Sequence, residues 1–440
     1  MRSRIAAPTS PRLPTSPMLR RTRRRTRAIL AVVLAFSATA QLKAETSPQE
    51  YTAIAVQKLK EGNQKEALDA FTKAVELAPK DPIYRRNRAA FYARLKQWDQ
   101  AIADYSEVLS LDPKDTATIY NRGYAYLEAG KLDDAGNDFS AVLEQKPDDE
   151  KSLRYRSYVY TQLKQPDKAI ADLSKLIEKN PKDLAALQAR ADLHLLANDY
   201  SDAISDYSQA IEIDPKNTSA LSGREVAYVK SGDKTKALAD LNTLTTLQPH
   251  DTKLLVQRAQ LNFEAGQYDQ AISDYSKAIQ ANPKDATLYA GRGYSEMKKQ
   301  DTAAAGKDFE QALALDPKNA EYTQALSYLN LSKSDYGKAA DDYTKLIDLK
   351  PDDLSLYLKR GDLYLRVQKW DQAKADFTKV LEKEPDNAEA QAGQGFAIAK
   401  TGNLRAGAEQ MQDALKKTTD AHLQEVIQAR LRELGIGPKL

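Results

Sequence analysis

Proline recurs every 34 residues over most of this chain, and this spacing limits the possible folds more than any other feature. The series continues without an insertion or a deletion. Its members are Pro79, Pro113, Pro147, Pro181, Pro215, Pro249, Pro283, Pro317, Pro351 and Pro385. Strict self-similarity at such a period is typical of one supersecondary unit stacked many times. The length of 440 residues therefore does not predict several globular domains.

Other positions of the repeat keep the same register. If the proline is numbered position 32, the first repeat begins at Pro48 and position 20 is alanine in ten repeats, from Ala67 to Ala373. Position 24 is large and apolar or aromatic in the same ten. Positions 20, 24 and 27 share one face of a helix, and an earlier stripe such as Ile119, Gly123 and Tyr126 predicts a second helix. Each repeat is therefore two helices.

Turn and cap residues separate these helices. Glycine stands between them in five repeats, where a left-handed backbone costs little. These glycines are Gly62, Gly130, Gly232, Gly266 and Gly402. Position 34 is Asp or Asn in every complete repeat, two residues after the proline, and predicts the N-cap of the next helix.

The pattern of a 34-residue helix–turn–helix, with small residues at 8 and 20, an aromatic at 24 and proline at 32, resembles the tetratricopeptide repeat (TPR). The resemblance covers residues 48–418, as about eleven repeats. It implies an all-α fold, a right-handed TPR superhelix or α-solenoid. The eleventh repeat departs from the pattern at Gly407, Met411 and Thr419. The apolar stripe that follows predicts a C-terminal capping helix at 419–434, before a tail at 435–440.

Two charged positions predict an ion-pair ladder between the paired helices. Position 7 is Arg in eight repeats, where the family usually has Leu, and position 23 is Asp in nine. Both positions face other helices, and a partly buried charge requires a partner. We expect the pairs Arg88–Asp104, Arg122–Asp138, Arg156–Asp172, Arg190–Asp206, Arg292–Asp308 and Arg360–Asp376. Repeat nine is the mismatch, with Leu326 opposite Asp342. A phosphate- or ion-binding stripe is the alternative interpretation.

By the same resemblance, the first helices line a concave groove that binds a protein or peptide segment. The candidate groove residues are Arg86, Arg94, Tyr120, Tyr124, Lys151, Arg154, Tyr158, Tyr294 and Tyr328. Aromatic anchors beside basic groups favour an acidic segment or a free C-terminal carboxylate. The alternative is a solvated face whose tyrosines pack on their neighbours. The family's chaperone-binding carboxylate clamp, with Lys at 5 and Asn at 9, is absent from repeats two and three.

The aromatic residues at position 17 have a structural interpretation. Trp98, Tyr200, Tyr268, Tyr336 and Trp370 stand in the turn between the two helices. We expect them to pack in the core and not to form a ligand cage.

Residues 1–40 have the pattern of a secretory signal peptide. A run rich in arginine precedes the short apolar segment 28–36 and an Ala-x-Ala site ending at Ala40. Cleavage there leaves a linker at 41–47, and Met18 is an alternative start. We expect a periplasmic or secreted protein without a membrane span in the mature form. The alternatives are an uncleaved membrane anchor and an arginine-rich arm that binds nucleic acid.

Charge and motif content limit the remaining functions. The net charge is +3, but the nine arginines of residues 1–40 leave −6 for residues 41–440, so we expect no nucleic-acid partner. No cysteine is present, the three histidines are scattered, and no catalytic fingerprint occurs. We therefore expect no enzyme, cofactor or metal site. The sequence predicts an exported, non-enzymatic scaffold or adaptor. The alternative is a solenoid subunit of a cell-envelope assembly, in outer-membrane biogenesis or polysaccharide secretion.

Overall fold

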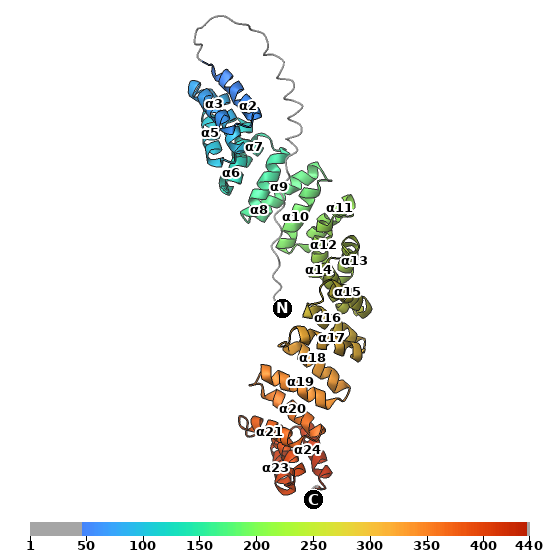
Figure 1. The fold of residues 1–440 in the computed structure, drawn as a ribbon. Helices are drawn as coiled ribbons and strands as arrows, with labels where there is room; N and C mark the ends of the chain where they lie inside the picture. The colour runs from blue at the N-terminus through green and yellow to red at the C-terminus, as the bar shows by residue number, and fades with distance from the viewer. Residues whose placement is uncertain (1–45, 438–440) are drawn as a thin grey trace, which may run out of the picture. The chain divides into compact units, whose positions relative to one another are not determined.

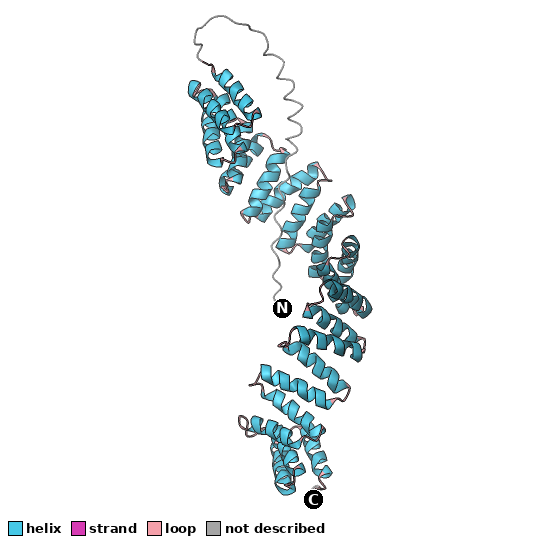
Figure 2. Cartoon of the chain, in the orientation of Figure 1, coloured by secondary structure: helices cyan, strands magenta, loops and turns pink. Residues whose placement is uncertain are grey.

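The computed structural model describes residues 46–437, and every regular element in this range is an α-helix (Figure 1). Figure 2 shows helices joined by short loops along the described chain, which contains no strand. The predicted leader, its cleavage site and most of the linker lie outside the described residues. No helix among the described residues has the length and apolar character needed to cross a bilayer.

The chain forms two compact parts, divided after Ala125. The N-terminal part contains α2 (Pro48–Lys60), α3 (Gln64–Leu77), α4 (Pro82–Arg94), α5 (Trp98–Leu111) and most of α6 (Thr116–Glu128). Even-numbered helices up to α22 are the first helices of the repeats, and odd-numbered helices are the second. Within this part α2 packs against α3, α3 against α4, and α4 against α5.

The C-terminal part begins in the last residues of α6 and continues the same alternation. Its first eight complete helices are α7 (Leu132–Gln145), α8 (Glu150–Gln162), α9 (Pro166–Lys179), α10 (Leu184–Ala197), α11 (Tyr200–Ile213), α12 (Thr218–Ser231), α13 (Lys234–Leu247) and α14 (Thr252–Glu264). They are followed by α15 (Tyr268–Ala281), α16 (Ala286–Lys298), α17 (Thr302–Leu315), α18 (Ala320–Ser332) and α19 (Tyr336–Leu349). The last five are α20 (Leu354–Arg366), α21 (Trp370–Leu381), α22 (Ala388–Lys400), α23 (Leu404–Lys417) and α24 (Ala421–Glu433).

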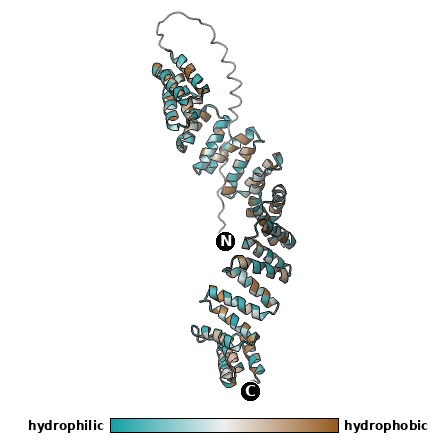
Figure 3. Ribbon diagram, viewed as in Figure 1, coloured by the Kyte–Doolittle hydropathy of each residue, from teal (hydrophilic) through white to brown (hydrophobic). Residues whose placement is uncertain are grey.

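Neighbouring helices share the core of this part. Every helix from α7 to α23 packs against the next helix along the chain, and three first helices also contact the first helix of the next repeat. The alanines of position 20 and the large residues of position 24 are buried in this stack, with the exception of Tyr343. Hydrophobic residues are accordingly spread over all helices in Figure 3 and do not gather in one centre. The predicted all-α solenoid of helix–turn–helix repeats is confirmed.

The predicted caps are confirmed at each boundary. The position-34 side chains accept hydrogen bonds from backbone N–H groups in the first turn of the next helix, which would otherwise lack partners. They are Asp81, Asp115, Asp149, Asp183, Asn217, Asp251, Asp285, Asn319, Asp353 and Asn387. Ser47 caps α2 in the same way, as part of a capping box with Glu50.

Position 15 has a positive φ in all eleven repeats, with or without glycine. Five of the residues are the predicted glycines, with φ from 76° at Gly130 to 110° at Gly402. The other six are Lys96, Lys164, Asn198, Gln300, Ser334 and Gln368. At Gly62 the paired hydrogen bonds Asn63 N–H to Lys58 O and Gly62 N–H to Leu59 O close the helix in a Schellman motif. The turn therefore imposes the left-handed conformation whatever the side chain.

Helix α24 covers the C-terminal end of the stack. Ile427 and Leu431 are buried in the cluster that contains Phe396 and Met411. Arg430 forms an ion pair of 2.8 Å with Asp362 on α20. This helix performs the capping role that solenoid ends require, since an uncovered last repeat would expose apolar surface.

Candidate functional site

The charged positions 7 and 23 meet inside each repeat of the C-terminal part where both are present. Arg156 donates from Nε and Nη2 to the two carboxylate oxygens of Asp172, at 2.8 and 2.7 Å. The same bidentate geometry joins Arg190–Asp206, Arg224–Asp240, Arg258–Asp274, Arg292–Asp308 and Arg360–Asp376. Two parallel charge-assisted bonds are the strongest arrangement available to this pair.

The N-terminal part contains one such pair. Arg88 binds both carboxylate oxygens of Asp104 at 2.7 Å. The predicted pair Arg122–Asp138 is divided between the two parts of the chain. Within the N-terminal part, Arg122 donates from Nη1 to Ser106 Oγ at 3.2 Å.

A contact that sequence analysis missed extends the ladder from one repeat to the next. The third guanidinium nitrogen of Arg156, Nη1, donates to Ser140 Oγ at 3.0 Å. Ser140 occupies position 25 of the preceding repeat. Equivalent bonds join Arg190–Ser174, Arg224–Ser208, Arg258–Asn242, Arg292–Ser276 and Arg360–Thr344. Each arginine therefore links the first helix of its repeat to the second helix of the same repeat and to the second helix of the preceding repeat. The recurrence of small polar residues at position 25 was the sequence signal.

Other groups replace the arginine in two repeats. In repeat nine, Asp342 accepts from Asn330 Nδ2 at 2.7 Å and from Lys345 Nζ at 3.2 Å. Burial raises the pKa of Asp342, and these two hydrogen bonds counteract it. In the eleventh repeat, Gln410 donates to Gln394, which donates in turn to Thr378, at 2.7 Å each.

Several candidate groove residues are engaged with their own repeat. Arg86 forms an ion pair of 2.7 Å with the N-cap Asp115, and Arg154 pairs with the N-cap Asp183. The candidates in the N-terminal part, Arg86, Arg94, Tyr120 and Tyr124, belong to α4 and α6. Lys151, Arg154 and Tyr158 belong to α8 in the C-terminal part. Lys151 and Arg94 are exposed, and the other residues of these two groups are half-buried.

The aromatic residues at positions 9 and 17 pack on each other. Tyr124 meets Trp98 edge-on, with ring centroids 6.3 Å apart, and Phe396 meets Trp370 at 6.0 Å. The five position-17 rings are half-buried at the start of second helices. Tyr294 contacts the Phe309 ring at 4.9 Å and donates its hydroxyl to Glu321. Burial, with Glu321 nearby, raises the pKa of the Tyr294 hydroxyl.

Tyr328 differs from the other tyrosines of the first helices. It is 62% exposed on α18, and no aromatic residue precedes it at position 17, where Thr302 stands. No hydrogen bond or ring contact engages it among the described residues. Tyr328 is thus an exposed aromatic side chain on a first helix.

The comparisons with known proteins fit the repeat geometry. A tetratricopeptide repeat model matches residues 120–183, 159–218, 291–353 and 358–422, more than half of the chain. The chain belongs to the tetratricopeptide repeat family. A TPR repeat model also matches residues 91–130 and 259–300, and a further tetratricopeptide repeat model matches residues 51–81. No curated protein matches the chain.

Solved TPR structures show partial similarity to this chain. A tetratricopeptide repeat protein from Parabacteroides merdae is 20% identical, with a TM-score of 0.39, over 64% of this chain and 98% of its own. The TPR protein YrrB, described as having an unusual peptide-binding site, is 26% identical over 42% of this chain and 96% of its own, with a TM-score of 0.38. Yeast Tom70 is 17% identical, over 88% and 96%, with a TM-score of 0.29.

The TPR scaffold is typical of protein–protein interaction, and TPR proteins bind protein or peptide partners. Proteins built from this repeat are generally non-enzymatic scaffolds. No group of three or more His, Cys, Asp or Glu residues within residues 46–437 is arranged to hold a metal ion.

Proposed function

We propose that this TPR protein is an exported, non-enzymatic adaptor that holds a segment of another protein on the surface of its first helices. The observation that carries the proposal is the exposure of Tyr328 on α18, since an exposed tyrosine on a scaffold helix is a typical anchor for a partner. Tyr158 on α8 is a second, half-buried candidate. In this proposal the ion-pair ladder stabilises the stack and does not bind the partner, because its arginines are paired with aspartates of the same repeat.

Export remains part of the proposal, supported by the arginine-rich and apolar pattern of residues 1–40. In this proposal the leader is removed and the repeats act outside the cytoplasm. N-terminal sequencing of the protein recovered from cells tests this step. A first residue at or near Gln41 is expected, and an intact Met1 or Met18 would contradict export with cleavage.

Site-specific photo-crosslinking in cells tests the binding surface. A photoreactive amino acid replaces Tyr328, Tyr158 or, as a control, the exposed Lys374 on the second helix α21. We expect the same partner, identified by mass spectrometry, to be captured from Tyr328 or Tyr158 and not from Lys374. Equal capture from all three positions, or capture from Lys374 alone, would contradict a site on the first helices. A partner found only in membrane fractions after a salt wash would favour the envelope-assembly subunit.

A further inference from the structure

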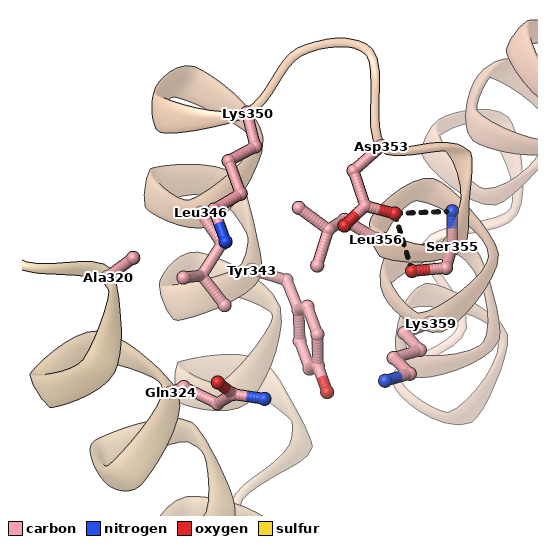
Figure 4. A pocket seen from close by; sticks show the side chains of 9 residues that line it. All are labelled: Ala320, Gln324, Tyr343, Leu346, Lys350, Asp353, Ser355, Leu356 and Lys359. Atoms are coloured by element: carbon pink, nitrogen blue, oxygen red, sulfur yellow. Dashed lines mark hydrogen bonds between the residues drawn. The ribbon is translucent and has the colours of Figure 1, made fainter.

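A cavity of about 160 Å³ lies between α18, α19 and α20 (Figure 4). Gln324 comes from α18, Tyr343 from α19 and Lys359 from α20, and their polar ends point into the same space in Figure 4. Lys350 and Asp353 line the side toward the connecting loop. The volume is several times the roughly 30 Å³ that a water molecule occupies in the liquid.

The cavity lies beside a position-24 ring that is less buried than its equivalents in the other repeats. In three repeats the ring at position 24 packs against a glycine at position 6 of the next repeat, whereas other repeats have Ala, Asn, Gln or Tyr at that position. At Gly291 an added Cβ would lie 2.5 Å from Tyr275 Cζ, so Tyr275 fills the space completely. Position 6 after Tyr343 is instead Lys359. Tyr343 is the one large position-24 residue in the described chain that is only half-buried.

Of the polar groups around this cavity, Gln324, Lys350 and Lys359 are exposed and Tyr343 is half-buried. Among the described residues, neither the Gln324 amide, the Tyr343 hydroxyl nor the Lys359 ammonium forms a hydrogen bond or ion pair. Lys350 also lacks an acidic partner. Asp353, the one acid in the lining, is already used as a cap, since its carboxylate accepts from Ser355 N–H and Oγ–H at 3.1 and 2.6 Å. The lining thus offers converging donors and two free cations to a ligand.

The surroundings of the cavity differ from the rest of the stack in two further ways. Leu326 interrupts the arginine ladder on the same helix, α18, that supplies Gln324. Tyr328, the exposed aromatic residue, follows Gln324 by four residues, so both lie on one face of α18. An anchor ring and a cationic cavity are therefore neighbours on a single first helix.

We propose that the cavity binds a carboxylate of an acidic peptide segment, with Tyr328 packing against the adjacent peptide residue. This inference rests on the proposed function and names its ligand class. Donors from an ammonium, an amide and a phenol match the acceptor-only chemistry of a carboxylate. Lys350 supplies a second positive charge and forms no ion pair among the described residues. The residues at positions 5, 6 and 24 that form the site are not the Lys at 5 and Asn at 9 of the family's clamp.

Fluorescence anisotropy with three peptides on the full chain tests the proposal. The first probe is a fluorescein-labelled decapeptide of alternating Glu and Leu with a free C-terminus. The second replaces every Glu with Gln, and the third amidates the C-terminus. Weaker binding of the glutamine probe assigns the site to an acidic side chain, whereas weaker binding of the amidated probe assigns it to a terminal carboxylate. A wild-type protein that binds the acidic and the glutamine probes equally, with no loss on amidation, overturns the proposal.

Variants locate the binding in the cavity. Lys359→Met keeps the methylene stem and should weaken binding of the acidic probe about tenfold or more, as expected for the loss of a charged hydrogen bond. Tyr343→Phe removes only the hydroxyl and should weaken binding by about two- to fivefold. The matched control Lys374→Met removes an exposed lysine of α21 and should change the dissociation constant less than twofold.

The outcomes separate this proposal from the adaptor function. Unchanged affinity in both Lys359→Met and Tyr343→Phe, with circular dichroism showing an intact fold, overturns the carboxylate site. In that case partner capture from Tyr328 in the crosslinking experiment would still support the adaptor. Equal losses in Lys359→Met and Lys374→Met would indicate general attraction between charges and would also overturn the site.

Discussion

At the scale of single residues, the position-7 arginine bonds side chains of two different helices. Arg190 holds both carboxylate oxygens of Asp206, which is 3% exposed, and also bonds Ser174. The hydrogen bond to Asp206 raises the pKa of Arg190, so the guanidinium stays charged. Removal of one member of a buried pair leaves the other charge without compensation.

We therefore expect Arg190→Met to lower the free energy of unfolding by about 3 kcal/mol. The double variant Arg190→Met/Asp206→Leu should recover most of this loss, because no buried charge remains. Urea denaturation followed by circular dichroism measures both. Lys379→Met, which breaks the exposed pair with Glu382, is the control and should cost less than about 0.5 kcal/mol. A cost as small in Arg190→Met would show that the ladder does not stabilise the stack.

Glu225 on α12 is a buried acid outside the ladder. It is 6% exposed, and burial together with Asp240 raises the pKa of its carboxyl to about 7, against a smaller lowering effect of Lys253. In the unfolded chain the same group titrates near 4.5. Between these values the unfolded state loses its proton first, so the stability contribution present below pH 4.5 is lost as the pH rises toward 7.

Glu225→Gln should remove this dependence. The difference in unfolding free energy between variant and wild type should be small at pH 4.5 and grow to the order of 3 kcal/mol in favour of the variant at pH 8. Urea titrations at several pH values measure it. Parallel stability curves for the two proteins would mean that Glu225 ionises normally in the folded state.

At the scale of elements, the turn between paired helices imposes its conformation on unfavourable residues. Gln300 adopts φ 65°, a region that costs an L-residue about 1 kcal/mol or more, whereas Gly232 adopts φ 90° with little strain. Gln300→Gly should thus raise the unfolding free energy by about 0.5 to 1 kcal/mol, and Gly232→Ala should lower it by about 1 kcal/mol. Thermal unfolding of the two variants should shift in opposite directions, and shifts of the same sign would contradict this account.

The two-helix repeat could be predicted from the sequence because its signals are local. Pro, Asp and Gly mark the ends of helices wherever they stand, so the caps and five of the turns followed directly. The turn at Gln300 did not follow, because its conformation comes from the closing hydrogen bonds of the helix and not from the residue type. The Arg–Asp pairs could also be predicted from the sequence, since both residues belong to one repeat.

Contacts between repeats were harder to predict. The bond from Arg156 to Ser140 requires the position-7 side chain to reach past its own repeat, which a pattern within one repeat does not reveal. Asp342 lacks the usual position-7 arginine and accepts a hydrogen bond from Asn330 instead. Asn330 stands at a different position of the repeat, so the repeat pattern did not predict this pair. The cavity at Tyr343 could not be predicted, because its lining combines residues of two consecutive repeats. The pairing of the candidate groove residues Arg86 and Arg154 with N-cap aspartates could not be predicted from the sequence pattern.

At the scale of the whole molecule, stability in an array of repeats depends mainly on nearest neighbours, and the ends depend on their caps. In the C-terminal part, α24 covers the apolar surface of the last repeat through Ile427 and Leu431. Lys400 and Glu433 add an ion pair of 2.7 Å between α22 and α24. Loss of this helix should therefore weaken nearby repeats first.

A chain that ends at Thr418 should show faster amide exchange in α22 and α23, while α10 to α16 keep their protection. Hydrogen exchange with mass spectrometry measures this gradient, and light scattering should detect association through the uncovered surface. A chain that ends at Gly437 is the control. Uniform loss of protection along the C-terminal part would indicate that these repeats unfold as one cooperative block.

The inter-repeat bond has a consequence for how an array of this kind can grow. Most repeats of the C-terminal part contain both halves of the joint, the arginine at position 7 and the small polar acceptor at position 25. A duplicated repeat would thus bring a donor for the repeat before it and an acceptor for the repeat after it. Gene duplication can lengthen such a chain by 34 residues at a time without inventing a new interface. Repeat eight has Glu310 at position 25, and repeat nine has Leu326 at position 7. An insertion between these two repeats would therefore not restore the arginine bond on both sides.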